Sequence, residues 1–118
     1  MLFRSVAILD ESEELGSEDD WVTVALVRYG RALVASASGE HDSAVALARS
    51  AVSLADDREY LNFRAQLWLG LGRILLAADR RDEAREALGE ALRLAELKGS
   101  TVFVDEARAL LGELAATG

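Results

Sequence analysis

The sequence predicts an all-α protein, and three observations point to that class. Alanine and leucine dominate a chain of 118 residues that has no proline and only 6% aromatic residues, a composition that favours helix over most of the chain. No segment alternates apolar and polar residues for long enough to form a strand. Polar turns, several with glycine, divide the chain at regular intervals. We therefore expect antiparallel helices joined by short turns.

Local signals set the expected helix boundaries. The segment "SEDD" at 17–20 is a capping box, and Gly39 and Gly99 follow periodic apolar segments that they are expected to end. The polar segments 55–59 and 79–83 are expected to be connections. A partial helix in residues 1–16 brings the expected number to about six. The other expected helices are Trp21 to Ser38, His41 to Leu54, Tyr60 to Ala78, Glu83 to Lys98 and Thr101 to Ala116.

Composition excludes several classes of function. The chain is long enough for one domain, 1–118, and 51% of its residues are hydrophobic. It has no cysteine, so it has neither disulfides nor a thiolate metal site. It shows no signal peptide and no apolar run of about 20 residues that could cross a bilayer. We expect a cytoplasmic protein that does not bind membranes, and a net charge of −8 argues against nucleic acid as the partner.

The negative charge is concentrated in one short segment. Residues 10–20 hold seven acids and no base, whereas fourteen acids and twelve bases follow residue 20. We interpret this segment as a solvated connection that includes a helix N-terminus. A calcium loop is the alternative, but the segment lacks the D-x-[DN]-x-[DN]-G spacing.

The sequence repeats itself at a constant offset, which aligns position 38 with position 78. Segment 38–56, "SGEHDSAVALARSAVSLAD", aligns without gaps with segment 78–96, "ADRRDEAREALGEALRLAE". In this alignment Ala44 pairs with Ala84, and beyond it Ala32 pairs with Gly72. The repeated unit is a pair of helices. We expect copies at 17–56 and 57–98, the first helix of a third copy at 99–118, and the tail of a truncated copy at 1–16.

One copy has the spacing of a known helical repeat. The helix expected at 60–78 has W-x2-L-G spacing at Trp68, Leu71 and Gly72. The next helix, expected at 83–98, has A-x3-(large)-x2-A spacing, starting at Ala84. This resembles the tetratricopeptide repeat, although the chain lacks the terminal proline and its period exceeds the usual length of about 34 residues. A generic array of helical hairpins is the alternative. The resemblance implies a solenoid of helix hairpins, A and B, packed through Ala32, Ala44, Ala51, Trp68, Leu71, Gly72, Ala84, Leu88, Ala91 and Gly112.

A second resemblance covers roughly residues 10–115. Segments such as "GEHDSA", "RRDEAREAL" and "ARALLGEL" are similar to the C-terminal tetratricopeptide region of large bacterial signalling proteins. These include adenylate-cyclase-like proteins and ATPase-type transcriptional regulators. The resemblance implies a non-catalytic module that binds protein. The alternative is a severed regulatory segment that packs on its own catalytic domains, and the chain contains no G-x-x-x-x-G-K-[ST] motif of its own.

The same resemblance implies where a partner would bind. In tetratricopeptide arrays the A helices line a concave groove that takes a peptide or helix. Tyr29 and Leu33 stand where chaperone-binding members carry the lysine and asparagine of a carboxylate clamp, so we do not expect that specificity. The alternative is that the leucines of this groove are covered by a neighbouring segment or by a second copy of the chain, which packs on the exposed ends of the repeat array. The expected groove residues are Leu26, Tyr29, Leu33, Gln66, Leu69, Arg73 and Leu76, and Gly70 is expected to face the same surface.

The residues that could support catalysis do not form a pattern. His41 is the only histidine and is expected to be a solvent-facing turn residue. The adjacent Glu40 and Asp42 are not expected to converge with it on a metal. The acids of segment 82–90 are expected to form surface ion pairs, Asp82 with Arg85 and Glu90 with Arg93. We therefore expect no enzyme, no cofactor and no metal site.

Overall fold

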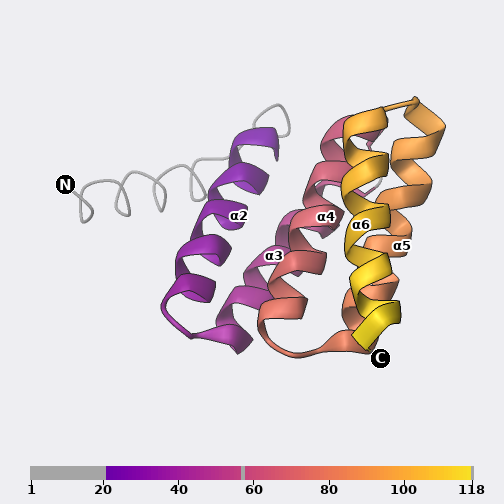
Figure 1. Ribbon diagram of the computed structural model, residues 1–118. Helices are drawn as coiled ribbons and strands as arrows, with labels where there is room; N and C mark the ends of the chain where they lie inside the picture. Colours follow the sequence, from indigo (N-terminus) through magenta and orange to yellow (C-terminus); the bar gives the residue numbers. More distant parts are fainter. Residues whose placement is uncertain (1–20, 57, 118) are drawn as a thin grey trace.

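The computed structural model describes residues 21–56 and 58–117, which form five α-helices and no strand. The all-α prediction is confirmed for this part of the chain. The partial helix, the capping box and the acidic segment expected before residue 21 lie outside the described residues. In Figure 1 the helices are α2 (Trp21–Ala37), α3 (His41–Ala55), α4 (Leu61–Ala77), α5 (Arg81–Lys98) and α6 (Thr101–Thr117).

The helices repeat with the period found in the sequence. Helices α4 and α6 begin at Leu61 and Thr101, so their starts are displaced by the offset of the sequence alignment, and α2, described from Trp21 on, fits the same spacing. Helices α3 and α5 begin at His41 and Arg81, which are related by the same offset. The helix expected at 83–98 begins earlier, at position 81, because the carbonyl of Arg80 already accepts a helical hydrogen bond at 2.9 Å. The helix starts are therefore evenly spaced along the described chain.

Three of the four turns share one hydrogen-bonding pattern. Gly39, Asp79 and Gly99 follow α2, α4 and α5 with positive φ angles of 81°, 60° and 80°. In each turn the amide of the next residue donates to the carbonyl five positions earlier, at 2.9 Å. This is the Schellman motif, which ends a helix in the left-handed conformation. Glycine adopts that conformation without strain, whereas Asp79 is an L-residue in the same place.

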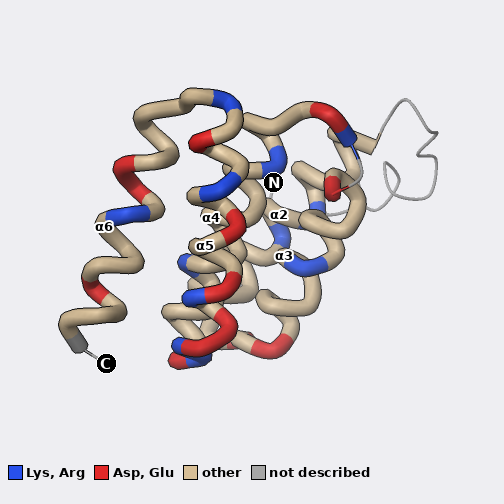
Figure 2. The backbone as a smooth tube through the Cα atoms, turned by 90° about the vertical axis from the view of Figure 1, so that its right-hand side faces the viewer, with Lys and Arg blue, Asp and Glu red and all other residues tan. Residues whose placement is uncertain are grey.

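The helices form two layers. Each helix packs most closely on its neighbour in the chain, while α2 also touches α4, and α4 touches α6. Helices α2, α4 and α6 therefore lie side by side in one layer, and α3 and α5 form the other. Figure 1 shows this row, with α2 at one edge and α6 at the other, and in Figure 2 α6 stands to one side of the other helices. The arrangement is that of a helical-repeat fold.

Small residues bring the helices of each hairpin together. A Cβ atom placed on Gly72 would lie 2.5 Å from the Cδ2 atom of Leu88, so any larger residue at this position would have to displace that leucine. Leu88 itself is fully buried. In the first hairpin the equivalent positions hold Ala32 and Ala48, which are 0% and 1% exposed. The close approach of α4 and α5 offsets the helix propensity that Gly72 loses.

An aromatic cluster fixes the start of α2 against the start of α4. The Trp21 ring lies 5.8 Å from that of Tyr60 and 5.6 Å from that of Phe63, measured between centroids. The guanidinium carbon of Arg58 lies 4.9 Å from the centroid of the Trp21 ring, a cation–π geometry. The loop between α3 and α4 thus joins the first hairpin to the second.

Candidate functional site

The layer of α2, α4 and α6 presents one continuous surface, beginning with a tyrosine against a glycine. A Cβ atom on Gly70 would lie 2.3 Å from the Tyr29 hydroxyl oxygen and 2.5 Å from its Cζ atom. The Tyr29 ring from α2 therefore rests directly on the backbone of α4. Gly70 is explained by this contact, because any side chain there would displace the ring.

An ion pair continues the surface from α4 to α6. The Nη2 atom of Arg73 donates to the Oε2 atom of Glu106 at 2.7 Å. Their side chains are 53% and 38% exposed, so water weakens the attraction between them. The pair nevertheless places one positive and one negative group in the middle of the surface.

The electrostatics of Tyr29 depend on its position in this surface. Burial of the phenol raises its pKa, the nearby Arg73 lowers it, and Glu106 raises it again. The net direction is upward, since desolvation of the charged phenolate has the largest effect. Tyr29 therefore keeps its proton at neutral pH and can donate a hydrogen bond.

Apolar side chains flank the polar centre. Leu26 and Leu33 of α2 are 46% and 47% exposed. Leu76, at the end of α4, is half-buried and lines a hollow together with Glu113 of α6. Gln66, one turn before Gly70, is exposed. These residues and the polar centre form a single candidate site, which we call the inner surface: Leu26, Tyr29, Leu33, Gln66, Gly70, Arg73, Leu76, Glu106 and Glu113.

Leu69 does not belong to the inner surface, although the sequence analysis placed it there. It is only 2% exposed and is part of the main hydrophobic core. Helical periodicity assigns a residue to one side of an isolated helix. In this fold α4 lies between two neighbouring helices, and a residue turned toward a neighbour is buried.

Most of the expected packing residues lie in the core. All of them are at most 1% exposed except Trp68, Gly72 and Gly112. Gly72 is buried, and Trp68 is half-buried with its Nε1 atom 3.3 Å from the Oδ1 atom of Asp56. Gly112 is exposed and would meet nothing within 4 Å if it carried a Cβ atom. It has no packing role here because, among the described residues, no helix lies on α6 as α5 lies on α4.

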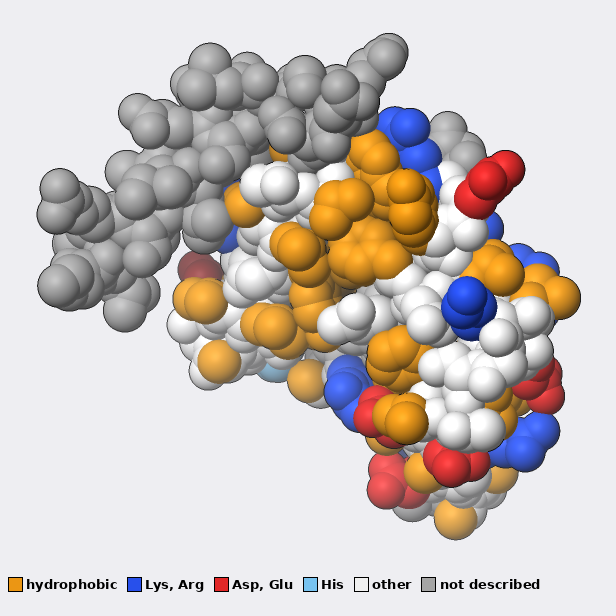
Figure 3. All heavy atoms as spheres, turned by 90° about the horizontal axis from the view of Figure 1, so that it is seen from above, with side chains coloured by type: hydrophobic (Ala, Val, Ile, Leu, Met, Phe, Trp, Pro, Cys, Tyr) orange, Lys and Arg blue, Asp and Glu red, His pale blue; other side chains and the backbone are white. Residues whose placement is uncertain are grey.

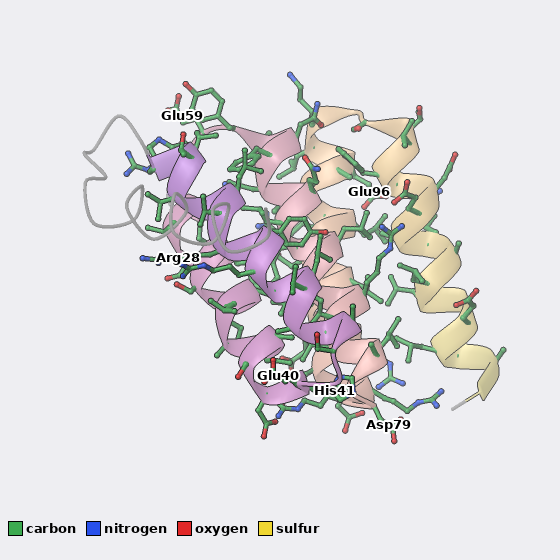
Figure 4. All side chains as sticks on the ribbon, turned by 90° about the vertical axis from the view of Figure 1, so that its left-hand side faces the viewer. Arg28, Glu40, His41, Glu59, Asp79 and Glu96 are labelled. Carbon is green, nitrogen blue, oxygen red and sulfur yellow. The ribbon has the colours of Figure 1, made fainter. Side chains whose placement is uncertain are left out.

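The groups with catalytic or metal-binding potential do not converge. His41 is the first residue of α3 and is half-buried, rather than the fully solvent-facing residue that we expected. Figure 4 shows it beside Glu40 at the turn, at the opposite end of the array from Glu59. Within residues 21–56 and 58–117, no three histidine, aspartate or glutamate side chains are grouped to hold a metal.

The surface charges of α5 pair as predicted. Arg85 donates to Asp82 at 3.0 Å, and Arg93 donates to Glu90 at 2.6 Å. The hydrogen bond from Arg93 is the main cause of a lowered Glu90 pKa. These pairs lie on the solvent-accessible face of α5 and are worth little individually.

The sequence analysis missed a second exposed apolar region. Tyr60, Leu97 and Val102 are 65%, 64% and 64% exposed, and they lie at the start of α4, the end of α5 and the start of α6. Figure 3 views this end of the molecule, where hydrophobic side chains gather. Helical periodicity gave no signal for this region, because its residues come from the ends of different helices.

Comparison with known proteins adds no assignment. No family model, no curated protein and no solved structure matches the chain significantly. Among the described helices, none is both long enough and apolar enough to cross a bilayer.

Proposed function

We propose that the chain is a tetratricopeptide-like module that binds a peptide or a helix of another protein on its inner surface. The observation that carries the proposal is the contact of three helices, α2, α4 and α6, through Tyr29, Gly70, Arg73 and Glu106. A continuous surface built from every second helix of a repeat array suits an extended ligand, because each helix adds one row of contacts.

The chemistry of the inner surface supports a protein ligand. Leu26 and Leu33 offer exposed apolar side chains two helical turns apart. Tyr29 and Arg73 can donate hydrogen bonds, and Glu106 can accept them. Apolar area with a few placed polar groups is typical of peptide-binding grooves. The resemblance to signalling proteins suggests a regulatory setting for this binding.

Selection from a displayed library of random peptides tests the proposal. The native chain is the bait, and the affinity of each selected peptide is then measured by calorimetry for three proteins. We expect Arg73→Glu to weaken binding at least tenfold, because it replaces a central donor with an acid beside Glu106. Leu97→Glu is the matched control, since Leu97 is exposed on α5 outside the inner surface, and it should leave affinity unchanged.

Two results would overturn the proposal. One is selection of no peptide that binds the native chain in solution. The other is a set of peptides that bind Arg73→Glu as tightly as the native chain but fail on Leu97→Glu. That pattern would move the binding site to the apolar region that contains Tyr60, Leu97 and Val102.

A further inference from the structure

Within residues 21–56 and 58–117, no helix covers the side of α2 that carries Val34, whereas the same side of α4 and of α6 is covered. Val34 of α2 is 58% exposed, whereas Ile74 and Leu114, at the equivalent positions of α4 and α6, are each 2% exposed. On α4 and on α6, the helix that precedes each of them in the chain provides this cover: α3 packs on α4, and α5 packs on α6. The open side of α2 therefore has the apolar character of a packed surface.

The open side contains a hollow of a specific shape. Thr23, Leu26, Val27 and Gly30 line it. Their positions are i, i+3, i+4 and i+7, which form the four-residue hole that accepts one side chain of a facing helix in knobs-into-holes packing. A Cβ atom on Gly30 would meet nothing within 4 Å, so another helix can approach the backbone closely at this point.

Side chains of the right kind to fill the hollow lie on the same helix. Leu33 and Val34 are exposed and stand three and four residues after Gly30, whereas Val27 and Leu26 stand three and four before it. If a second α2 crosses antiparallel at Gly30, its Leu33 and Val34 face the hollow, and the reverse contact follows by symmetry. An isologous interface requires this self-complementarity.

We propose that a second copy of this chain packs its α2 antiparallel across this side, with the two-fold axis at Gly30. The four residues that line the hollow are uncharged, and α2 contains no acid; its two charged residues are Arg28 and Arg31. The inference does not rest on peptide binding, but Leu26 and Leu33 belong to both surfaces, so the dimer and a peptide bound there compete for them. One helix face from each copy makes a small interface, so the dimer forms weakly and reversibly.

A single engineered cysteine tests the position of the axis. The chain has no cysteine, so Gly30→Cys introduces one thiol, at a site where its Cβ atom clashes with nothing in the monomer. Two such thiols at a two-fold axis come within disulfide reach. Under mild oxidation we expect most of the Gly30→Cys chain to become a covalent dimer. Val102→Cys, at an equally open position on α6, should remain mostly monomeric.

Sedimentation equilibrium of proteins without an engineered cysteine supplies the second measurement. The native chain should show a reversible monomer–dimer equilibrium between micromolar and millimolar concentrations. Val34→Glu should weaken dimerisation by at least about tenfold, since it places an unpaired charge in the interface. Val102→Glu is the matched control and should leave the equilibrium unchanged.

Several outcomes would overturn the proposal. They are a native chain that stays monomeric throughout, a Val102→Cys chain that cross-links as readily as Gly30→Cys, and a Val34→Glu chain that dimerises normally. If Gly30→Cys forms a disulfide only after residues 1–20 are deleted, the chain's own N-terminal segment covers this side and the dimer is excluded. Arg73→Glu should not change dimerisation, so failure of this inference is distinguishable from failure of peptide binding.

Discussion

Hairpins α2–α3 and α4–α5 have the same arrangement of helices but different side chains where the two helices of each hairpin meet. Hairpin α2–α3 places two alanines, Ala32 and Ala48, where hairpin α4–α5 places Gly72 beneath Leu88. Both contacts are buried, although one is made by two small residues and the other by a glycine beneath a large one. The difference also makes the second hairpin the more sensitive one, because a single large side chain fills its contact.

The hairpins also differ in their turns. Gly39 closes the first and Asp79 the second, with the same hydrogen bonds and positive φ angles of 81° and 60°. Only glycine occupies that region without steric cost. The second hairpin therefore retains strain that the first avoids, and replacements that make the two hairpins alike test both differences.

The largest expected effect comes from removing the large side chain of the second hairpin. Leu88→Ala should lower the free energy of unfolding by about 2–5 kcal/mol, because it leaves a cavity in a fully buried site. Urea unfolding followed by circular dichroism measures the change. A loss below about 1 kcal/mol would show that α4 and α5 collapse onto the smaller pair, as α2 and α3 do.

The effect of Gly72→Ala on stability should change sign when Leu88 is also replaced. In the native chain Gly72→Ala should destabilise by about 1 kcal/mol, since the cost of overpacking against Leu88 exceeds the gain in helix propensity. In the Leu88→Ala background the same change should stabilise by about 1 kcal/mol, because the new methyl group fills space. A double-mutant cycle from urea unfolding gives both values, and equal effects in the two backgrounds would contradict the packing described here.

The turn comparison predicts a smaller gain in stability. Asp79→Gly should raise the free energy of unfolding by about 1 kcal/mol, because it relieves the left-handed strain of an L-residue. Gly39→Asp, the reciprocal change, should lower it by a similar amount. Thermal unfolding of both variants beside the native chain checks the pair. Opposite signs support the strain, and a loss in both variants would assign Asp79 a stabilising role of its own.

The smallest effect concerns alkaline pH. Burial raises the Tyr29 pKa in the folded chain, so the folded state holds the proton more tightly than the unfolded state. That contribution to stability is complete below the unfolded pKa of about 10 and is lost as pH rises through the folded value. Tyr29→Leu introduces the residue that the second hairpin has at the equivalent position, Leu69. It should flatten the dependence of the free energy of unfolding on alkaline pH. Urea unfolding between pH 8 and about pH 11 measures it, and an unchanged slope would contradict the assignment.

Much of the fold followed from the sequence, because it is encoded locally. Glycine signals and apolar periodicity gave helices that agree with the structure to within about two residues, and the offset of the sequence repeat reappeared in the helix starts. The ion pairs of Arg85 and Arg93 followed because both partners lie on one helix.

Contacts between helices were harder to predict. The burial of Leu69 depends on its position between neighbouring helices, and the resting place of Tyr29 on Gly70 depends on the offset between α2 and α4. Neither leaves a periodic signal. Glycine at position 70 was a clue to a close neighbour, but an ambiguous one, because the helical glycines Gly30, Gly89 and Gly112 would meet nothing within 4 Å if they carried a Cβ atom.

The even spacing of the turns also bears on how such a chain can change in length. Residues 40–79 begin and end within Schellman turns that have the same backbone geometry. A tandem duplication of that block would join Asp79 to a second Glu40 and rebuild a turn of the same kind. Unequal recombination at these points would therefore add whole hairpins without moving any helix out of register.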